Sequence, residues 1–207
     1  PVLNMVRDSA SPADGDGIAR IYFTADNDAG EPENFVRIKA SIIDASNGSE
    51  DGQLRISRMI GGGDQNVLSF LNTETVVNDD SKDLDFRVES DGNTHALFVD
   101  GGNNHVNIGT STAYAGKLNI ETTDNSFNLF LVSTDADANA GPNMKFYRNS
   151  SSPADSDITG NIHFTGRNDN SQDVDYAQIE TLIADASDGT EDGYMNIYVA
   201  HAGTKAR

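Results

Sequence analysis

The chain carries a long internal repeat, and this repeat constrains its fold more than any other feature. Residues 1–63 align with residues 142–204 at a constant offset of 141 without a gap, and about 24 of the 63 positions are identical. Two segments this similar share one fold, so any structural interpretation has to suit both copies. The best-matched blocks are Arg7–Asp14 with Arg148–Asp155, and Asp44–Gly52 with Asp185–Gly193.

Both copies show the alternation of apolar and polar side chains that is typical of β-strands with one buried face. Ile21 and Phe23 alternate with Arg20, Tyr22 and Thr24 in the first copy, and the second copy keeps the two apolar positions. Turn-forming Pro, Asp, Asn and Gly residues separate the alternating runs. The sequence therefore predicts a meander of about four strands in each copy, near residues 3–8, 18–26, 34–44 and 53–60 and at the counterparts 141 residues later.

Two further details of the repeat lead to predictions. Asn47-Gly48 and its counterpart Asp188-Gly189 are pairs that favour a type I′ hairpin turn, in which both central residues take positive φ. Arg37 and Lys39 become Gln178 and Glu180 in the second copy. Because this basic pair is lost without a change of pattern, we interpret these outward positions as a solvated face.

The segment between the copies, residues 64–141, also reads as β-structure. Short alternating runs at 85–90, 96–100 and 106–110, separated by tight turns, predict three strands at intervals of about ten residues. Residues 117–121 and 128–133 continue the same theme. No amphipathic helix is predicted.

This middle segment resembles a module of the tail-fibre proteins of tailed bacteriophages, especially those of marine phages such as cyanophages. The resemblance rests on Asp85–Asn93, on Leu97–Gly102 and on Val106-Asn107-Ile108-Gly109-Thr110, where Asn107 replaces a Gly that is usual in the module. Residues 131–139 and 147–155 also resemble such fibres. The resemblance implies a β-rich, homotrimeric rod on the virion, and it supplies no catalytic residues.

Composition excludes several classes of protein. The chain has no Cys, which excludes a disulfide scaffold, a thiolate nucleophile and a zinc ribbon. Its formal charge of −19 argues against a nucleic-acid partner, because a phosphate backbone requires Lys and Arg. No apolar run approaches the roughly 18 residues that span a bilayer, so we expect no membrane insertion. The chain begins with Pro1, which indicates a piece of a longer polypeptide.

The candidate metal sites are weak. Asp135, Asp137 and Asn139 begin like a calcium-binding EF-hand loop, but the Gly falls at position 7 and position 12 would be Phe146. A polar turn is the preferred interpretation, although a calcium site of another kind in this loop, or in Asp14-Gly15-Asp16, stays open. The four histidines, His95, His105, His163 and His201, lack metal-ligand spacing, and the last two align with Tyr22 and Ile60.

Catalytic motifs are equally sparse. There is no Gly-x-Ser-x-Gly elbow, and Gly61-Gly62-Gly63 lacks the Lys that follows in a phosphate-binding loop. The repeated acidic pairs, Glu50-Asp51 and Glu191-Asp192, sit beside a turn Gly and are interpreted as exposed turn carboxylates. Asn47 and Asn149 begin short glycosylation-type patterns of the kind that occur by chance. We therefore predict no catalytic residues, no metal ligands and no cofactor.

The predicted fold is all-β, with tandem small β-meander or sandwich modules at 1–63 and 142–207 joined by a linking β segment at 64–141. Hydrophobic residues make up 36% of the chain, so a meander of 63 residues hides too little apolar area to offset chain entropy alone. Association of three parallel copies into an elongated trimer would supply the missing burial and would protect strand edges. Whether the trimer is sandwich-like or helically wound stays open.

The sequence-based hypothesis for function is a structural part of a virion appendage, extracellular, with two further copies of the chain and other tail proteins as partners. One alternative is a module that binds host-surface glycans, with Tyr22, Tyr194 and Tyr198 as aromatic candidates. The other is a polysaccharide depolymerase, which would need two carboxylates about 5–9.5 Å apart in a groove.

Overall fold

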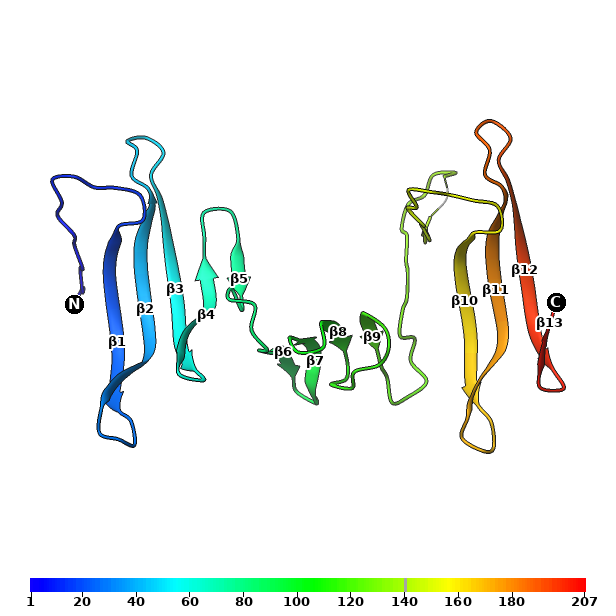
Figure 1. Ribbon diagram of the computed structural model, residues 1–207, viewed down its shortest axis with the longest axis horizontal. Coiled ribbons are helices and arrows are strands. Elements are labelled where there is room, and N and C mark those ends of the chain that lie inside the picture. Colours follow the sequence, from blue (N-terminus) through cyan, green and yellow to red (C-terminus); the bar gives the residue numbers. More distant parts are fainter. Residues whose placement is uncertain (140) are drawn as a thin grey trace. The chain divides into compact units, whose positions relative to one another are not determined.

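The protein is all-β, as predicted. The computed structural model describes residues 1–139 and 141–207, and among these it contains thirteen strands and no helix (Figure 1). The strands form three separate sheets, of five, four and four strands. The chain divides into two compact units, residues 1–130 and 131–207.

The first sheet is an antiparallel meander in which the strands lie in chain order. Its strands are β1 (Gly17–Asp26), β2 (Pro32–Asp44), β3 (Asp51–Ile60), β4 (Gly63–Phe70) and β5 (Thr75–Val77) (Figure 1). Two of these strands come largely from beyond the repeated segment, so the sheet continues past residue 63.

The third sheet repeats the first. Its strands are β10 (Ile158–Arg167), β11 (Asp173–Asp185), β12 (Asp192–His201) and β13 (Thr204–Ala206), and the bounds of the first three are those of β1, β2 and β3 plus 141. The pairing register also agrees: Ile21 lies opposite Ile38, and Ile162 lies opposite Ile179. Even the register irregularities fall at equivalent residues in the two sheets, so the repeat is structural as well as sequential.

Identical loop contacts explain why the best-matched blocks of sequence are loops. The Asp14 carboxylate accepts a hydrogen bond from the Ala45 backbone N–H at 2.9 Å, and Asp155 does the same for Ala186 at 2.9 Å. Arg7 donates to the Gly17 carbonyl oxygen and pairs with Asp16, as Arg148 does with the Ile158 carbonyl and Asp157. The aspartate bonds join the chain before the first strand of each copy to the loop after the second, and the arginine contacts fix the segment that leads into the first strand.

The middle sheet contains the only parallel pairing among the described strands. It is ordered β6 (Phe86–Ser90), β7 (Asn93–Asp100), β8 (His105–Ile108) and β9 (Leu118–Ile120), and β8 pairs with β9 in parallel. The predicted strands at 85–90, 96–100, 106–110 and 117–121 are therefore confirmed. The parallel register places Asn107 beside Asn119, whose Nδ2 donates to Asn107 Oδ1 at 2.7 Å.

Three predicted strands are absent. Residues 3–8, their counterparts 144–149, and residues 128–133 form no strand. The first two segments do not pair with a sheet edge, because Met5 and Phe146 instead lie against the apolar side of their sheets. Met5 lines a small cavity of about 70 Å³ with Ala19, Ile38 and Leu54, and a methyl group at Gly160 would approach Phe146 Cβ to 3.2 Å.

The predicted type I′ turns are wrong. Gly48 and Gly189 have φ values of +92° and +85°, but Asn47 and Asp188 do not take positive φ. The loops are longer than a two-residue hairpin connection, because β2 ends at Asp44 and β3 begins only at Asp51. Side-chain bonds from Asp44 to the Ser46 N–H and the Ser49 hydroxyl hold this wider turn.

The prediction of a buried apolar face is also corrected. Phe98, 7% exposed, is the one large hydrophobic residue that is buried among the described residues. The other buried side chains are polar, and they include Ser41, Ser57, Ser69, Asn107, Gln178, Glu180 and Asn196. Alternation identified which face is apolar, but each sheet is a single layer. The interpretation of the outward positions as a solvated face is wrong for Gln178 and Glu180, which are buried by neighbouring polar side chains.

The Asp185 loop gives a pH-dependent prediction. Hydrogen bonds from Ser187, and then from Thr190, hold the pKa of Asp185 below its ordinary value of 3.8. A carboxylate with a lowered pKa contributes stability above pH 3.8 and loses it as the pH falls through its folded pKa. We expect Asp185→Ala to lower the melting temperature at neutral pH, and the gap from the unmodified protein to close below pH 3.8.

Thermal unfolding followed by circular dichroism over a pH series measures this gap. Asp188→Ala is the matched control, because it makes the same charge change in the same loop at a residue that accepts no loop hydrogen bond. An equal gap for both variants at every pH would contradict this account of the loop.

Candidate functional site

An uncovered apolar face is the most prominent surface of the third sheet. In the strand register Ile162, Ile179 and Ile197 form one cross-strand row, and Phe164, Ala177 and Val199 form the next. Phe164 is 54% exposed and Ile197 is 61% exposed. A row of large apolar side chains in water is unfavourable by about 25 cal/mol for each Å² left exposed, so this face requires a cover.

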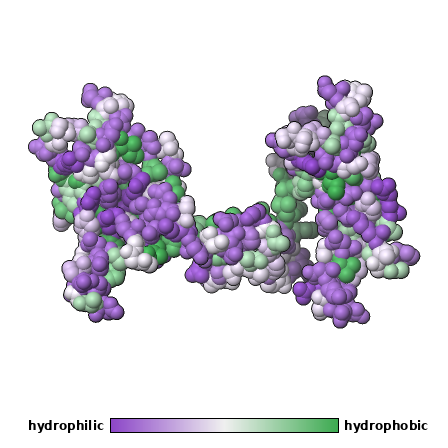
Figure 2. Space-filling view, viewed as in Figure 1, coloured by the Kyte–Doolittle hydropathy of each residue, from purple (hydrophilic) through white to green (hydrophobic). Residues whose placement is uncertain are grey.

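The other two sheets have apolar faces of the same kind. The first sheet carries the row Ile21, Ile38, Ile56, Leu68 and Val77 across all five strands. The middle sheet carries the row Phe86, Val99, Val106 and Leu118. Figure 2 shows hydrophobic atoms at the surface of the parts that carry these sheets. We call these three surfaces the apolar faces.

The accessible surface gives the size of the uncovered area. The chain exposes 15270 Å². Two separate monomeric bodies of the sizes of its two units would together expose about 11,000 Å² by the scaling of surface with mass. The excess, about 4,000 Å² on one chain, is larger than the roughly 1,000–2,500 Å² that each partner contributes to an obligate interface of about 2,000–5,000 Å² in total.

The polar face of the third sheet satisfies its own hydrogen bonds. Asn196 Nδ2 and the Tyr198 hydroxyl both donate to Glu180 Oε1, at 3.3 Å and 3.1 Å. Gln178 Nε2 donates to Asn161 Oδ1 at 2.8 Å, and the Lys205 ammonium lies 4.0 Å from the centre of the Tyr198 ring. This face is a closed network with its polar groups paired.

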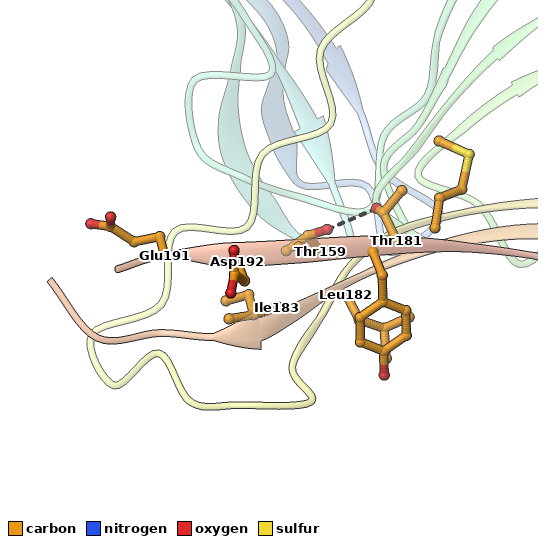
Figure 3. A pocket seen from close by; sticks show the side chains of 9 residues that line it. Thr159, Thr181, Leu182, Ile183, Glu191 and Asp192 are labelled. Carbon is orange, nitrogen blue, oxygen red and sulfur yellow. Dashed lines mark hydrogen bonds between the residues drawn. The ribbon is translucent and has the colours of Figure 1, made fainter. Parts of the chain in front are cut away.

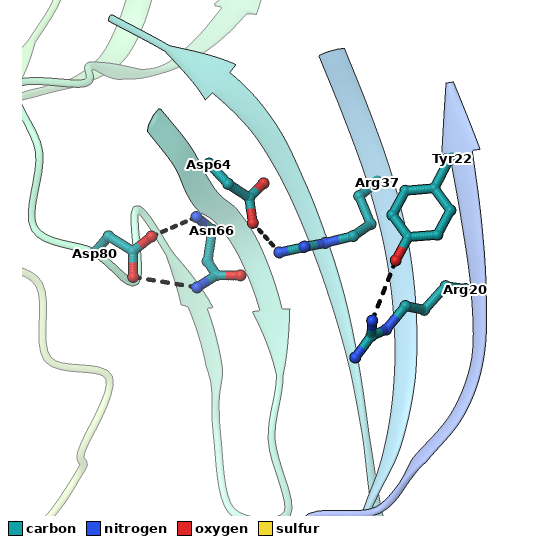
Figure 4. A network of polar contacts seen from close by, with 6 residues as sticks. All are labelled: Arg20, Tyr22, Arg37, Asp64, Asn66 and Asp80. Carbon is teal, nitrogen blue, oxygen red and sulfur yellow. Dashed lines mark hydrogen bonds and ion pairs between the residues drawn. The ribbon is translucent and has the colours of Figure 1, made fainter. Parts of the chain in front are cut away.

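The polar face of the first sheet carries positive charge instead. Arg20, Lys39 and Arg55 lie directly opposite one another on β1, β2 and β3, and Arg37 lies one pair along. Arg37 pairs with Asp64 across β3, and Arg20 donates to the Tyr22 hydroxyl at 3.2 Å (Figure 4). The row contains no acceptor of its own.

Acidic residues after β5 lie over another part of this face. Asp80 accepts from the Asn66 backbone N–H at 2.6 Å and from Asn66 Nδ2 at 3.1 Å (Figure 4). These bonds, with smaller contributions from Lys82 and Arg55, lower the pKa of Asp80. Asp79 accepts from the Ser69 hydroxyl at 2.7 Å and lies 3.9 Å from Arg55.

A hollow in the third sheet offers little chemistry. It has a volume of about 560 Å³ and lies where β11 and β12 meet their loop, beside Thr159, Thr181 and Tyr194. The Thr159 and Thr181 hydroxyls bond to each other at 2.7 Å (Figure 3). Glu191 and Asp192 stand at its rim, and backbone hydrogen bonds lower the pKa of Glu191.

The four histidines lie in separate contexts. The His95 ring packs edge-on against Phe98 at 5.1 Å, and His163 bonds to Asp175 at 2.9 Å. His105 begins β8 and His201 ends β12. Within residues 1–139 and 141–207, no three His, Cys, Asp or Glu side chains gather as metal ligands.

The acidic candidates from the sequence are engaged in local turns. Asp137 accepts from the Asn139 N–H at 2.7 Å, and Asp135 accepts from the Asp137 N–H at 3.2 Å. Glu50 accepts from the Gly48 N–H at 3.1 Å. Every described carboxyl whose pKa shifts has it lowered, whereas a glycosidase acid needs a raised one.

The aromatic candidates fall on the polar faces. Tyr194 and Tyr198 share one face of β12, with the Arg207 guanidinium 6.0 Å and 5.8 Å from their rings. Tyr22 lies on the other repeat, beside Arg20. Sequence reasoning did not predict the charged row beside Tyr22. The sequence shows Arg37 and Lys39 on one strand, but only the pairing register places Arg20 and Arg55 next to Lys39.

Comparisons with known proteins add no relative. No family model, no curated protein and no solved structure matches the chain. Among the described residues there is also no helix of sufficient length and hydropathy to cross a membrane.

The apolar faces give a mutational prediction. Ile162 and His163 are neighbours on β10 that point to opposite faces. If another chain covers the apolar face, Ile162→Asn will bury an amide there and cost about 2–4 kcal/mol of stability. His163→Asn is the control; it removes one exposed hydrogen bond to Asp175 and is expected to change stability by about 1 kcal/mol or less. Chemical unfolding of both variants measures the difference, and equal small losses would show that the apolar face is uncovered in solution.

Proposed function

We propose that the chain is a structural component of a virion appendage, a tail fibre or similar extracellular rod, in which three parallel copies associate. The observation that carries this proposal is the uncovered apolar face on every sheet, together with the large exposed surface of 15270 Å². Among the described residues, Phe98 is the one large hydrophobic side chain that is buried. The free energy gained by burying so little apolar surface does not offset the loss of chain entropy on folding.

Self-association is favoured over a different partner by the distribution of charge. The central apolar rows carry no charged side chain, in a chain whose formal charge is −19, and Arg58, opposite Val36, is a cation on the apolar face of the first sheet. Copies that meet through apolar faces keep their carboxylates apart and in water, so repulsion between like-charged chains is small. The outward acidic surface then keeps a long assembly soluble.

The tandem arrangement supports a spacer role. Two sheets of one design, separated by a smaller sheet, offer the same apolar rows twice along one chain. In parallel copies each sheet can therefore pack against the same sheet of the neighbouring copies, and this pairing fixes how the copies are aligned along their length. The resemblance of residues 85–110 to tail-fibre modules points to the same use. The function of such a rod is mechanical: it spans distance and presents a recognition tip.

Molar mass in solution tests this proposal. Light scattering on the purified chain, with electron microscopy of the same sample, is expected to give three times the mass of 22.1 kDa and an elongated particle. The melting temperature is expected to fall on dilution, because unfolding is coupled to dissociation. A monomeric mass with a melting temperature independent of concentration would contradict the proposal. Cleavage of a host polysaccharide by the chain would favour the depolymerase instead.

A further inference from the structure

The charged row on the first sheet departs from its repeat in a specific way. Arg20, Lys39 and Arg55 correspond to Asn161, Glu180 and Asn196, which form an amide–carboxylate–amide row on the third sheet. The two sheets share register and loop contacts, so the fold does not require the three cations.

The row is unfavourable in the chain by itself. Side chains directly opposite one another on neighbouring strands lie about 5 Å apart, and like charges in these positions are destabilising. Lys39 makes no hydrogen bond or ion pair with any described residue. Asp79 reaches Arg55 only at 3.9 Å, and Asp64 is engaged by Arg37. Asp79 and Asp80 therefore offset only the Arg55 end of the row, and an added anion would stabilise the end formed by Arg20 and Lys39.

Unpaired polar atoms beneath the row point to the same conclusion. The Nε atoms of Arg37 and Arg55 and the hydroxyl of Ser57 are buried without a hydrogen-bond partner. Ser57 is 1% exposed, and it lies opposite both Arg37 and Asn66 in the register. Each buried donor left unpaired costs about 1–3 kcal/mol, and rotation of the flexible Arg37 or Arg55 side chain would bring its Nε atom to an oxygen atom bound on this face.

We propose that Arg20, Lys39 and Arg55, with Tyr22 beside them, form a binding site for an acidic polysaccharide carrying carboxylate or sulfate groups. Guanidinium groups match the two oxygens of these anions, and the row runs about 10 Å across three strands, which suits a linear ligand. The Tyr22 ring is 43% exposed and offers a flat surface to a sugar ring. A nucleic acid is disfavoured, because its dense phosphates would meet the acidic remainder of the chain.

The site does not depend on the proposed assembly. It lies on the opposite side of the sheet from the apolar face, so it is accessible whether that face is covered or not. An acidic segment of a second copy is the competing occupant, and it has a different consequence for the mass in solution.

Calorimetric titration of the full chain tests the site. The probes are a galacturonate oligosaccharide, a heparin oligosaccharide and, as the neutral control, a maltose-type oligosaccharide of the same length. We expect at least one acidic probe to bind roughly ten times more tightly than the neutral one, with an affinity that falls as salt rises. Absence of binding by both acidic probes at low salt, or equal binding of the neutral one, would overturn the proposal.

Two triple variants test whether the acidic probe binds at the charged row. The triple substitution Arg20→Asn, Lys39→Gln and Arg55→Asn uses the residues of the third sheet at two positions, and it is expected to weaken binding by about tenfold or more. Its control removes three cations from elsewhere in the same unit, with Lys82→Gln, Arg87→Gln and Lys117→Gln, and should bind as the unmodified chain does. Equal losses in both triple variants would mean a general charge effect and would overturn the site.

Single-site and mass measurements complete the test. Lys39→Gln alone should weaken binding several-fold without lowering the melting temperature in the absence of ligand, since it removes a like-charge contact and no bond. A lowered melting temperature of Lys39→Gln would mean that Lys39 stabilises the fold, and this result would contradict the proposal. If the row triple variant alone changes the molar mass, the occupant is an acidic segment of another copy, and the polysaccharide site is wrong.

Discussion

The structure depends on apolar side chains that one copy of the chain cannot bury. Each sheet is a single layer, and many side chains of its apolar rows stay exposed, although Met5 and Phe146 lie against part of the apolar side. Backbone pairing and turn contacts define the shape of each sheet, but hydrophobic burial is the main source of folding free energy, and most of it is missing here. We propose that association of copies supplies the missing burial, and a rod would then follow from repeating these sheets along the chain.

The two repeats separate what the fold needs from what it permits. Loop residues such as Asp14 and Asp155, and the pair formed by Arg7 and Asp16, make the same bonds in both copies. The apolar rows are also kept, with Ile38 and Ile179 at their centres. The polar faces diverge, one into a closed hydrogen-bond network and the other into a charged row. The two copies thus keep the same apolar rows and differ on the opposite, polar surface.

Much of the fold could be predicted from the sequence, because alternation and turn residues are local signals. They located ten of the thirteen strands, but not β4, β5 and β13, which fall outside the alternating runs that were recognised. Local signals do not say what covers a face, so the burial of Ser57 and Asn107 beneath polar neighbours was not predicted. They also do not give register, and the row of Arg20, Lys39 and Arg55 exists only through register across three strands. Residues 3–8 are predicted as a strand, yet they form none, and Met5 packs against the apolar side of the first sheet.

Peroxide oxidation of Met195 tests the central claim most directly. This side chain lies on the apolar face of β12 and is 63% exposed in a single copy. Thioether oxidation depends on access of the oxidant, and it can be followed residue by residue through mass spectrometry. A covered face predicts that Met195 in the native protein oxidises far more slowly than in the chain unfolded by urea. Comparable rates in the two states would show that the face is open to water and would contradict the account.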